Sequence, residues 1–172
     1  MPSAVGSGDD APMAANSAPA PKGSSSLDEV SKSIIEQLQQ DGRRSYASIG
    51  KAVGLSEAAV RQRVQRLTEA GVMQIVAVTD PLQLGFGRQA MVGIHVEGAI
   101  QPVADALSEM EEVIYVVMTA GTYDVLCEVV ATGDEELLDL VSARIRAVPG
   151  VRNTETFMYL KLAKQTYSWG VR

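Results

Sequence analysis

The sequence predicts an α+β protein built from two modules, a helix-turn-helix domain followed by a ferredoxin-like βαββαβ domain. Three observations support this fold class. Between residues 27 and 72 the apolar side chains recur at helical spacing in three short stretches. The last two stretches are separated only by "GLS", residues 54–56, and such a Gly-containing turn between short helices is typical of a helix-turn-helix. Between residues 89 and 163, strand patterns alternate with helix patterns.

Each predicted helix has its own boundary signals. The first, in "SLDEVSKSIIEQLQQDGR", can begin at a capping Ser26 or Asp28. The second, in "YASIGKAVG", stops at Gly54, and the third follows Ser56 as its candidate N-cap. In the third helix Val60, Val64 and Leu67 form one apolar stripe. These features predict a compact helical domain over residues 27–72.

The rest of the chain divides at a Pro- and Gly-containing break, "TDPLQLGFG". We expect a short strand in "VMQIVAV" before it, so residues 73–88 are interpreted as a β-strand and linker. Strands are then expected at 89–97, 113–120, 125–132 and about 151–163, and helices at 100–110 and 134–147. Residues 1–26, of which nineteen are Ala, Pro, Ser or Gly, are expected to be a disordered tail, and residues 164–172 a C-terminal tail.

The predicted strands suggest that the sheet is apolar on both faces. Ala90, Val92 and Ile94 alternate with less apolar neighbours in the first strand, but the strand at 113–120 has apolar residues on both faces. Two helices suffice to cover only one face of four strands. We therefore expect the other face to pack against another sheet, which predicts self-association.

Composition restricts the class of protein. No apolar run approaches the roughly 18 residues of a membrane span, and no secretory signal is recognisable, so we expect a cytoplasmic protein without membrane partners. Cys127 is the only cysteine and agrees with a reducing compartment. The formal net charge is -6, yet residues 43–66 hold six basic residues and one acidic residue. This local basic segment points to a polyanionic partner.

The third helix carries much of that basic charge. On a helical wheel Ala58 and Gln62 point away from the apolar stripe, whereas Arg61 and Arg63 flank it on opposite sides and Arg66 lies between. An ordinary amphipathic helix with a solvated basic face would look similar. Behind a helix-turn-helix turn, however, the arrangement favours insertion into double-stranded DNA. The candidate DNA-contacting residues are Arg43, Arg44, Tyr46, Lys51, Ser56, Glu57, Ala58, Arg61, Gln62, Arg63 and Arg66.

Several motifs together resemble one family. The stretches "IGKAVGLSEAAVRQRVQRLTEAGV", "TDPLQLGF", "TAGTYDVL" and "VPGVRNTET" stand in the order and spacing of the Lrp/AsnC (feast/famine) transcriptional regulators. The resemblance covers residues 27 to about 163 and implies a winged-helix-type DNA-binding domain and an effector-sensing domain. It also implies dimers formed through the sheets, with further assembly into octamers. One departure is Ser31, where the family usually has an acidic residue.

The "TAGTYD" turn, residues 119–124, is open to two interpretations. It can be a plain hairpin in which Gly121 supplies a positive φ. The resemblance instead implies that it lines a cleft for an amino-acid effector, with Asp124 facing the ammonium and amides near Gly121 the carboxylate. The candidate effector-binding residues are then Thr119, Gly121, Tyr123, Asp124, Thr154 and Thr156.

Other functions remain as alternatives. His95, the only histidine, lacks partners at ligand spacing, so we expect a structural histidine and no metal or cofactor. The chain shows no set of nucleophile, base and orienting group, which argues against an enzyme on the ferredoxin-like fold. A metabolite-sensing oligomer that acts on protein partners is the remaining alternative. The favoured hypothesis is a sequence-specific transcriptional regulator that responds to a small molecule.

Overall fold

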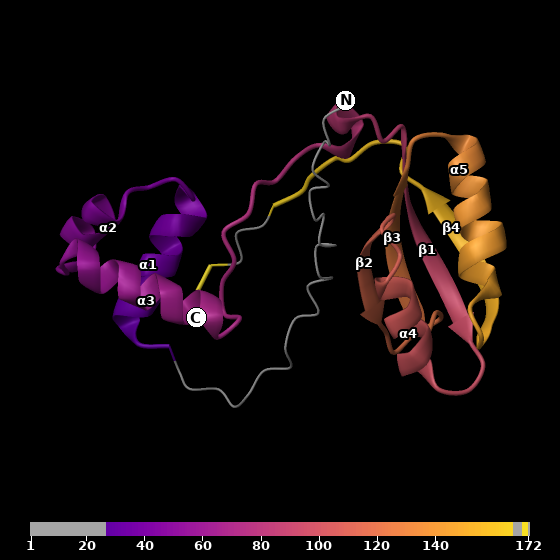
Figure 1. Cartoon of the computed structure of the whole chain (residues 1–172), viewed down its shortest axis with the longest axis horizontal. Coiled ribbons are helices and arrows are strands. Elements are labelled where there is room, and N and C mark those ends of the chain that lie inside the picture. The colour runs from indigo at the N-terminus through magenta and orange to yellow at the C-terminus, as the bar shows by residue number, and fades with distance from the viewer. Residues whose placement is uncertain (1–26, 167–169, 172) are drawn as a thin grey trace, which may run out of the picture. The chain divides into compact units, whose positions relative to one another are not determined.

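A computed structural model describes residues 27–166, 170 and 171 of the chain. Contacts between Cα atoms divide it into two compact units whose boundary falls between Leu84 and Gly85, inside the predicted break. We call residues 27–84 the helical unit and Gly85–Tyr159 the sheet unit, and describe each by itself (Figure 1). The tail predicted for residues 1–26, with the alternative cap Ser26, lies outside the described residues.

The helical unit contains α1 (Glu29–Gln40), α2 (Tyr46–Val53) and α3 (Glu57–Glu69), as the apolar spacing predicts. A side-chain oxygen caps each helix at its start, provided by Asp28, Ser45 and Ser56 in turn. The apolar stripes meet in one core, which contains Ile34, Leu38, Ile49, Val60 and Val64. Because the apolar stripe of α3 packs into this core, the opposite face of the helix lies in solvent.

The turn between α2 and α3 depends on two glycines. Gly54 ends α2 in the left-handed conformation, with φ 75°. Gly50 lies so close to the following chain that an added Cβ would be 2.5 Å from the Leu55 carbonyl oxygen. The close approach holds α3 across α2, which confirms the predicted helix-turn-helix.

The strand predicted in residues 72–78 is not formed. The described chain is extended there without strand pairing, and only a short 3₁₀ helix, Pro81–Leu84, precedes the sheet unit. Val76 is 68% exposed and Val78 57% exposed. A strand needs a hydrogen-bonding partner, and none of the described residues provides one beside this segment. The helical unit consequently carries no wing strand after α3 in this part of the chain.

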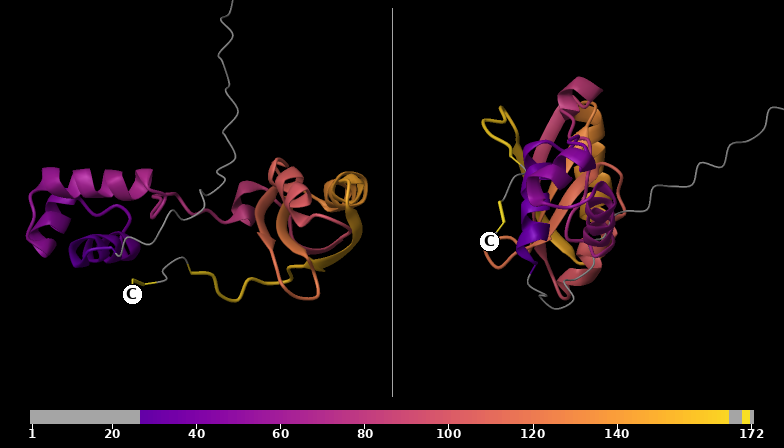
Figure 2. Two further views of the ribbon diagram at one scale, coloured as in Figure 1. Left: turned by 90° about the horizontal axis from the view of Figure 1, so that it is seen from below. Right: turned by 90° about the vertical axis from the view of Figure 1, so that its left-hand side faces the viewer.

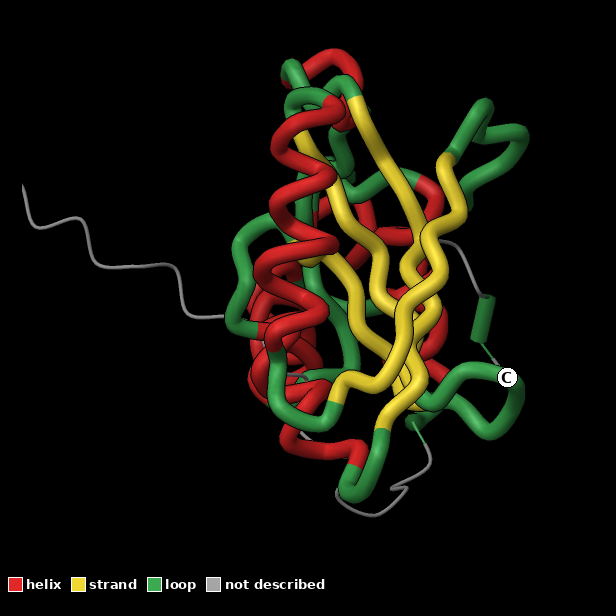
Figure 3. Tube along the Cα trace, turned by 90° about the vertical axis from the view of Figure 1, so that its right-hand side faces the viewer, coloured by secondary structure: helices red, strands yellow, loops and turns green. Residues whose placement is uncertain are grey.

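The sheet unit has the predicted βαββαβ order (Figure 1). Its strands are β1 (Arg88–Val96), β2 (Val113–Met118), β3 (Val125–Ala131) and β4 (Val151–Met158). They form one antiparallel sheet in the order β2-β3-β1-β4, the arrangement of a ferredoxin-like fold. The helices α4 (Ile100–Ser108) and α5 (Asp134–Asp139) lie on the same face of the sheet (Figures 2 and 3).

The two faces of this sheet differ in burial. Under the helices, Ala90, Val92 and Ile94 of β1 are fully buried, as is Cys127 of β3. Burial raises the pKa of the Cys127 thiol to about 12. On the open face, Tyr115 is 51% and Phe157 42% exposed. The predicted helix-covered face is therefore confirmed, and the opposite face retains exposed aromatic residues.

The helix predicted over residues 134–147 changes its winding. After α5 the chain continues as a π-helix, Leu140–Arg144, and a 3₁₀ turn, Ile145–Ala147. Leu140 and Ile145 are both buried although they are five residues apart. The wider π turn matches this spacing better than an α-helix does. None of the described helices is long and apolar enough to cross a membrane.

Candidate DNA-binding helix and effector turn

The outer face of α3 carries polar side chains without burying them. The Ser56 hydroxyl accepts a hydrogen bond from the Ala59 amide at 3.2 Å and starts the helix. Glu57, Ala58, Gln62 and Arg66 are then exposed. Glu57 pairs with Arg61 on the surface, whereas Ala58, Gln62 and Arg66 are open to contact with another molecule. The face expected from the wheel is the face that the structure leaves open.

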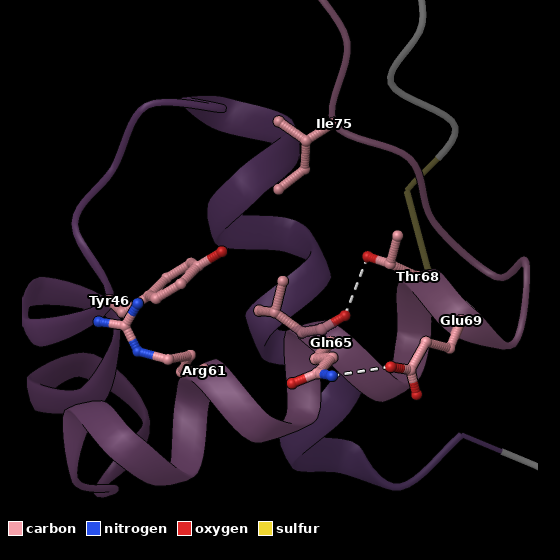
Figure 4. Close-up of a pocket in the computed structure, with 7 residues that line it drawn as sticks. Tyr46, Arg61, Gln65, Thr68, Glu69 and Ile75 are labelled. Atoms are coloured by element: carbon pink, nitrogen blue, oxygen red, sulfur yellow. Dashed lines mark hydrogen bonds between the residues drawn. The ribbon is translucent and has the colours of Figure 1, made fainter.

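Arg61 is preoriented by two neighbours on the surface. Its guanidinium carbon lies 5.4 Å from the centre of the Tyr46 ring, as Figure 4 shows. Its Nη2 atom lies 2.7 Å from Glu57 Oε1. The arginine side chain is 63% exposed, so the ion pair is screened by water and contributes little to stability. The contacts instead restrict where the guanidinium points. Tyr46 at the start of α2 thus supports a cation on α3.

Arg63 does not extend into solvent as the wheel suggests. Its Nη1 atom donates to Asp28 Oδ2 at 2.6 Å and to the Ser31 hydroxyl at 3.1 Å. The Arg63 guanidinium, and after it the hydroxyl and the amide of Ser31, lower the pKa of Asp28 to about 2 by hydrogen bonding to its carboxylate. Arg63 therefore fastens α3 to the start of α1, because the carboxylate cap of α1 is within its reach. Ser31, the departure from the family pattern, is the residue beneath it.

The remaining basic candidates lie around the start and end of α2. Arg43 and Lys51 are exposed, whereas the guanidinium of Arg44 donates a hydrogen bond to Gln37 of α1. Arg43 and Lys51 therefore present exposed positive charges, and Arg44 is partly engaged in the helical unit.

A shallow groove beside α3 was not predicted from the sequence. It has a volume of about 360 Å³, and Figure 4 shows the side chains that line it. Its lining residues are Tyr46, Arg61, Val64, Gln65, Thr68, Glu69 and Ile75. Ile75 belongs to the extended segment after α3 and is half exposed. The sequence signal was present in the apolar run "VMQIVAV", which we interpreted as a strand.

The turn between β2 and β3 is closed by its own polar groups. The Thr119 amide donates to the Asp124 carbonyl at 2.9 Å, and the Thr119 hydroxyl donates to the Tyr123 carbonyl. The Asp124 carboxylate accepts the Val96 amide at 2.8 Å. One Asp124 oxygen is thus already used within the fold. Gly121 is exposed and does not have a positive φ. The prediction that a positive φ requires a glycine at this position is therefore wrong.

Tyr123 folds onto the open face of the sheet. Its ring lies over Gly93, where an added Cβ would come within 2.7 Å of the ring. The same ring packs near His95 and Phe157, with ring centres 5.1 Å and 5.9 Å away. The Tyr123 hydroxyl donates to Glu155, and this bond raises the pKa of the hydroxyl. Tyr123 therefore joins the turn to the sheet face.

Thr154 and Thr156 do not join the other effector candidates. The β1–β4 register pairs them with Ile94 and Val92, whose side chains are on the helix-covered face. Tyr123 and Glu155 lie on the opposite face. Because strand side chains alternate between faces, the two threonines are separated from the turn by the sheet itself.

The fold and the capped, outward-facing α3 define a two-domain helix-turn-helix protein with a ferredoxin-like second domain. A family model for the AsnC-type helix-turn-helix domain matches residues 27–68, and a model for an AsnC-type C-terminal dimeric α+β barrel domain matches residues 86–172. The chain belongs to the AsnC/Lrp family of transcriptional regulators, which bind DNA and self-associate through this second domain.

Relatives similar in sequence are named as transcriptional regulators. The HTH-type transcriptional regulator FL11 of Pyrococcus horikoshii is 36% identical over 145 residues, which cover 81% of this chain and 93% of that protein. The proline dehydrogenase transcriptional activator of Rhizobium radiobacter is 30% identical over 145 residues, again 81% of this chain and 93% of the relative.

Solved structures agree on the fold. E. coli AsnC matches with a TM-score of 0.71 at 23% identity, over 83% of this chain and 97% of that chain. The regulator NMB0573 of Neisseria meningitidis, solved as a complex with L-Met, matches with a TM-score of 0.72 at 24% identity, over 83% and 96%.

Proposed function

We propose that this transcriptional regulator reads double-stranded DNA with the outer face of α3. The observation that carries the proposal is the open polar face of that helix, flanked by an oriented Arg61 and by Arg66. Ala58 and Gln62 would face base edges, while Arg61 and Arg66 would contact phosphates or guanine edges. Arg43 and Lys51 would add backbone contacts, and Arg63 would hold α3 in place without touching DNA.

The test is duplex binding to the chain's own upstream DNA over a range of salt concentrations. For Arg61→Ala with Arg66→Ala, the slope of log affinity against log salt should fall by about two units, because two phosphate contacts are lost. Arg146→Ala removes an exposed arginine from the sheet unit and is the control. An unchanged slope in the double variant would refute the role of α3.

We propose further that the effector is an amino acid or a related metabolite bound at the 119–124 turn. The turn is exposed at Gly121, and the half-buried Asp124 carboxylate supplies a negative charge for an ammonium group. A regulator of the same fold has been solved with L-Met. Thr119 and Tyr123 would shape the site, and Thr154 and Thr156 would not contact the ligand.

Calorimetric titration with a panel of amino acids tests this site. Asp124→Asn retains an oxygen for the Val96 amide while removing the charge, so it should weaken a ligand ammonium contact without unfolding the turn. Equal affinity for the same amino acid in both proteins would exclude Asp124 from the site.

For assembly, we propose that the open sheet face packs against the same face of a second chain and that dimers combine into octamers in the cytoplasm. The exposed Tyr115 and Phe157 supply apolar area for the first contact. Effector binding would shift these assembly states and so alter the spacing of α3 between subunits. Sedimentation with and without the amino acid tests this, and an unchanged species distribution alongside altered DNA binding would contradict it.

A further inference from the structure

The two exposed arginines on the outer face of α3 differ in their charge environment. Arg61 pairs with the carboxylate of Glu57, one helical turn earlier, and both side chains are exposed. Among the described residues, no hydrogen bond or ion pair engages the guanidinium of Arg66, which is also exposed. One cation of the helix is therefore accompanied by an anion, and the other is free.

The carboxylate of Glu57 lies on the face of α3 that we propose to contact DNA. It stands in the first turn of the helix, and its exposed neighbours are Ala58, Arg61 and Gln62. An exposed ion pair contributes little to the stability of a helix. Its effect on a polyanion is larger, because a carboxylate near DNA phosphates is repelled by them. A cytosine amino group, in contrast, donates a hydrogen bond that a carboxylate accepts.

Tyr46, the first residue of α2, holds the same arginine from a second helix. Its ring centre is 5.4 Å from the guanidinium carbon of Arg61, and Figure 4 shows the two side chains together. The tyrosine is half-buried and packs against the core of the helical unit, which fixes the ring. The ring therefore restrains the arginine, and the arginine restrains the carboxylate of Glu57.

We propose that Glu57 is a specificity-determining residue and that Tyr46 is a positioning residue, which acts through Arg61. At the preferred sequence the carboxylate accepts a hydrogen bond from a base amino group, which offsets its repulsion by the phosphates. At other sequences only the repulsion remains, so binding is weaker. Arg66, without a carboxylate beside it, supplies a contact that does not depend on sequence. The inference rests on the proposed role of α3 and names the residues that discriminate between duplexes.

Glu57→Gln tests the discrimination, with binding measured on the upstream duplex and on a random duplex of equal length. The variant should bind the random duplex about fivefold more tightly, the upper scale for one exposed charge interaction, without a matching gain on the upstream duplex. Glu29→Gln is the control, because Glu29 also stands in the first turn of its helix and pairs with Lys32 at 2.9 Å. Equal changes in the two variants would reduce the effect to net charge and overturn the proposal.

Tyr46→Leu tests the positioning role. It should reduce the preference for the upstream duplex, and Tyr46→Phe, which keeps the ring, should retain that preference. In an Arg61→Ala background, Tyr46→Leu should cause no further loss of preference, since the tyrosine acts through the arginine. A further loss in that background, or an equal loss in Tyr46→Phe, would mean that Tyr46 contacts DNA itself and would overturn its positioning role.

Arg66→Ala, measured on the same two duplexes, separates this proposal from the role of α3 as a whole. It should weaken binding to both duplexes alike. If it does so while Glu57→Gln leaves the preference unchanged, α3 contacts DNA but Glu57 does not discriminate, and only this inference is wrong. If neither variant alters binding to either duplex, α3 is not the DNA-binding helix and both proposals are wrong.

Discussion

The outer face of α3 and the 119–124 turn were both predicted as sites, and they use their polar residues in opposite ways. On α3, Gln62 and Arg66 are exposed, and the helix is held by its backbone, its Ser56 cap and its buried apolar stripe. In the turn, the Thr119 hydroxyl, the Asp124 carboxylate and the Tyr123 hydroxyl all accept or donate within the sheet unit. In a helix, the residues that hold the fold and the residues that can recognise a partner lie on different faces. A short turn uses the same side chains for both purposes.

This contrast has a practical consequence for mutagenesis. Substitutions on the outer face of α3 should alter recognition with little effect on folding. Substitutions in the turn should alter folding, so a lost ligand response there is informative only beside a stability measurement.

Tyr123→Ala should have the largest effect, a loss of about 2 kcal/mol in the free energy of unfolding of the sheet unit. The half-buried ring covers Gly93 and packs near His95 and Phe157, and its removal leaves a gap. Chemical denaturation of the full chain measures this. Tyr123→Phe is the control and should retain most of the stability, since only the exposed bond to Glu155 is lost. A loss as large in the control would mean that the hydroxyl, and not the ring, joins the turn to the sheet.

Ser56→Ala should destabilise the helical unit by about 1 kcal/mol, the usual cost of removing a helix N-cap. The Ser56 hydroxyl accepts the Ala59 amide, and alanine leaves that amide to water. Thermal unfolding followed by helical circular dichroism measures it. Ser56→Asp keeps a capping oxygen and should retain the stability. A neutral Ser56→Ala would show that α3 is held by packing alone.

The Asp28–Arg63 contact should make the helical unit sensitive to acid. The folded-state pKa of Asp28 is about 2, below its ordinary value of 3.8. The contact therefore contributes stability above about pH 4, and this contribution is lost as the pH falls towards 2. Asp28→Asn should remove this part of the acid dependence while keeping an oxygen at the cap. An identical pH profile for both proteins in denaturation would contradict the contribution.

Gln62→Ala should have the smallest effect on folding, within about 0.5 kcal/mol, because the side chain is exposed and makes no internal contact that supports the helix. The same change should weaken binding to the preferred duplex more than binding to a random duplex. Denaturation and paired binding measurements on one preparation test both statements. An equal loss of affinity for the two duplexes would mean that Gln62 contacts the DNA backbone and not the bases.

Much of this architecture was predictable because local spacing sets which face of an element is apolar. Val60, Val64 and Leu67 on α3 and Ala90, Val92 and Ile94 on β1 are buried as their periods predict. The same reasoning failed for residues 72–78, since a strand depends on a partner that sequence patterning does not supply.

The sequence by itself determined the three helices of the helical unit, the Ser56 cap of α3, the order of helices and strands along the chain and the outward face of α3, all of which follow from backbone periodicity and nearby residues. Only the tertiary structure decided that Arg63 turns to Asp28, 35 positions away, and that Tyr123 reaches Glu155, 32 positions away. Long side chains contact groups that are close in space, and residues distant in the sequence come close only when the chain folds.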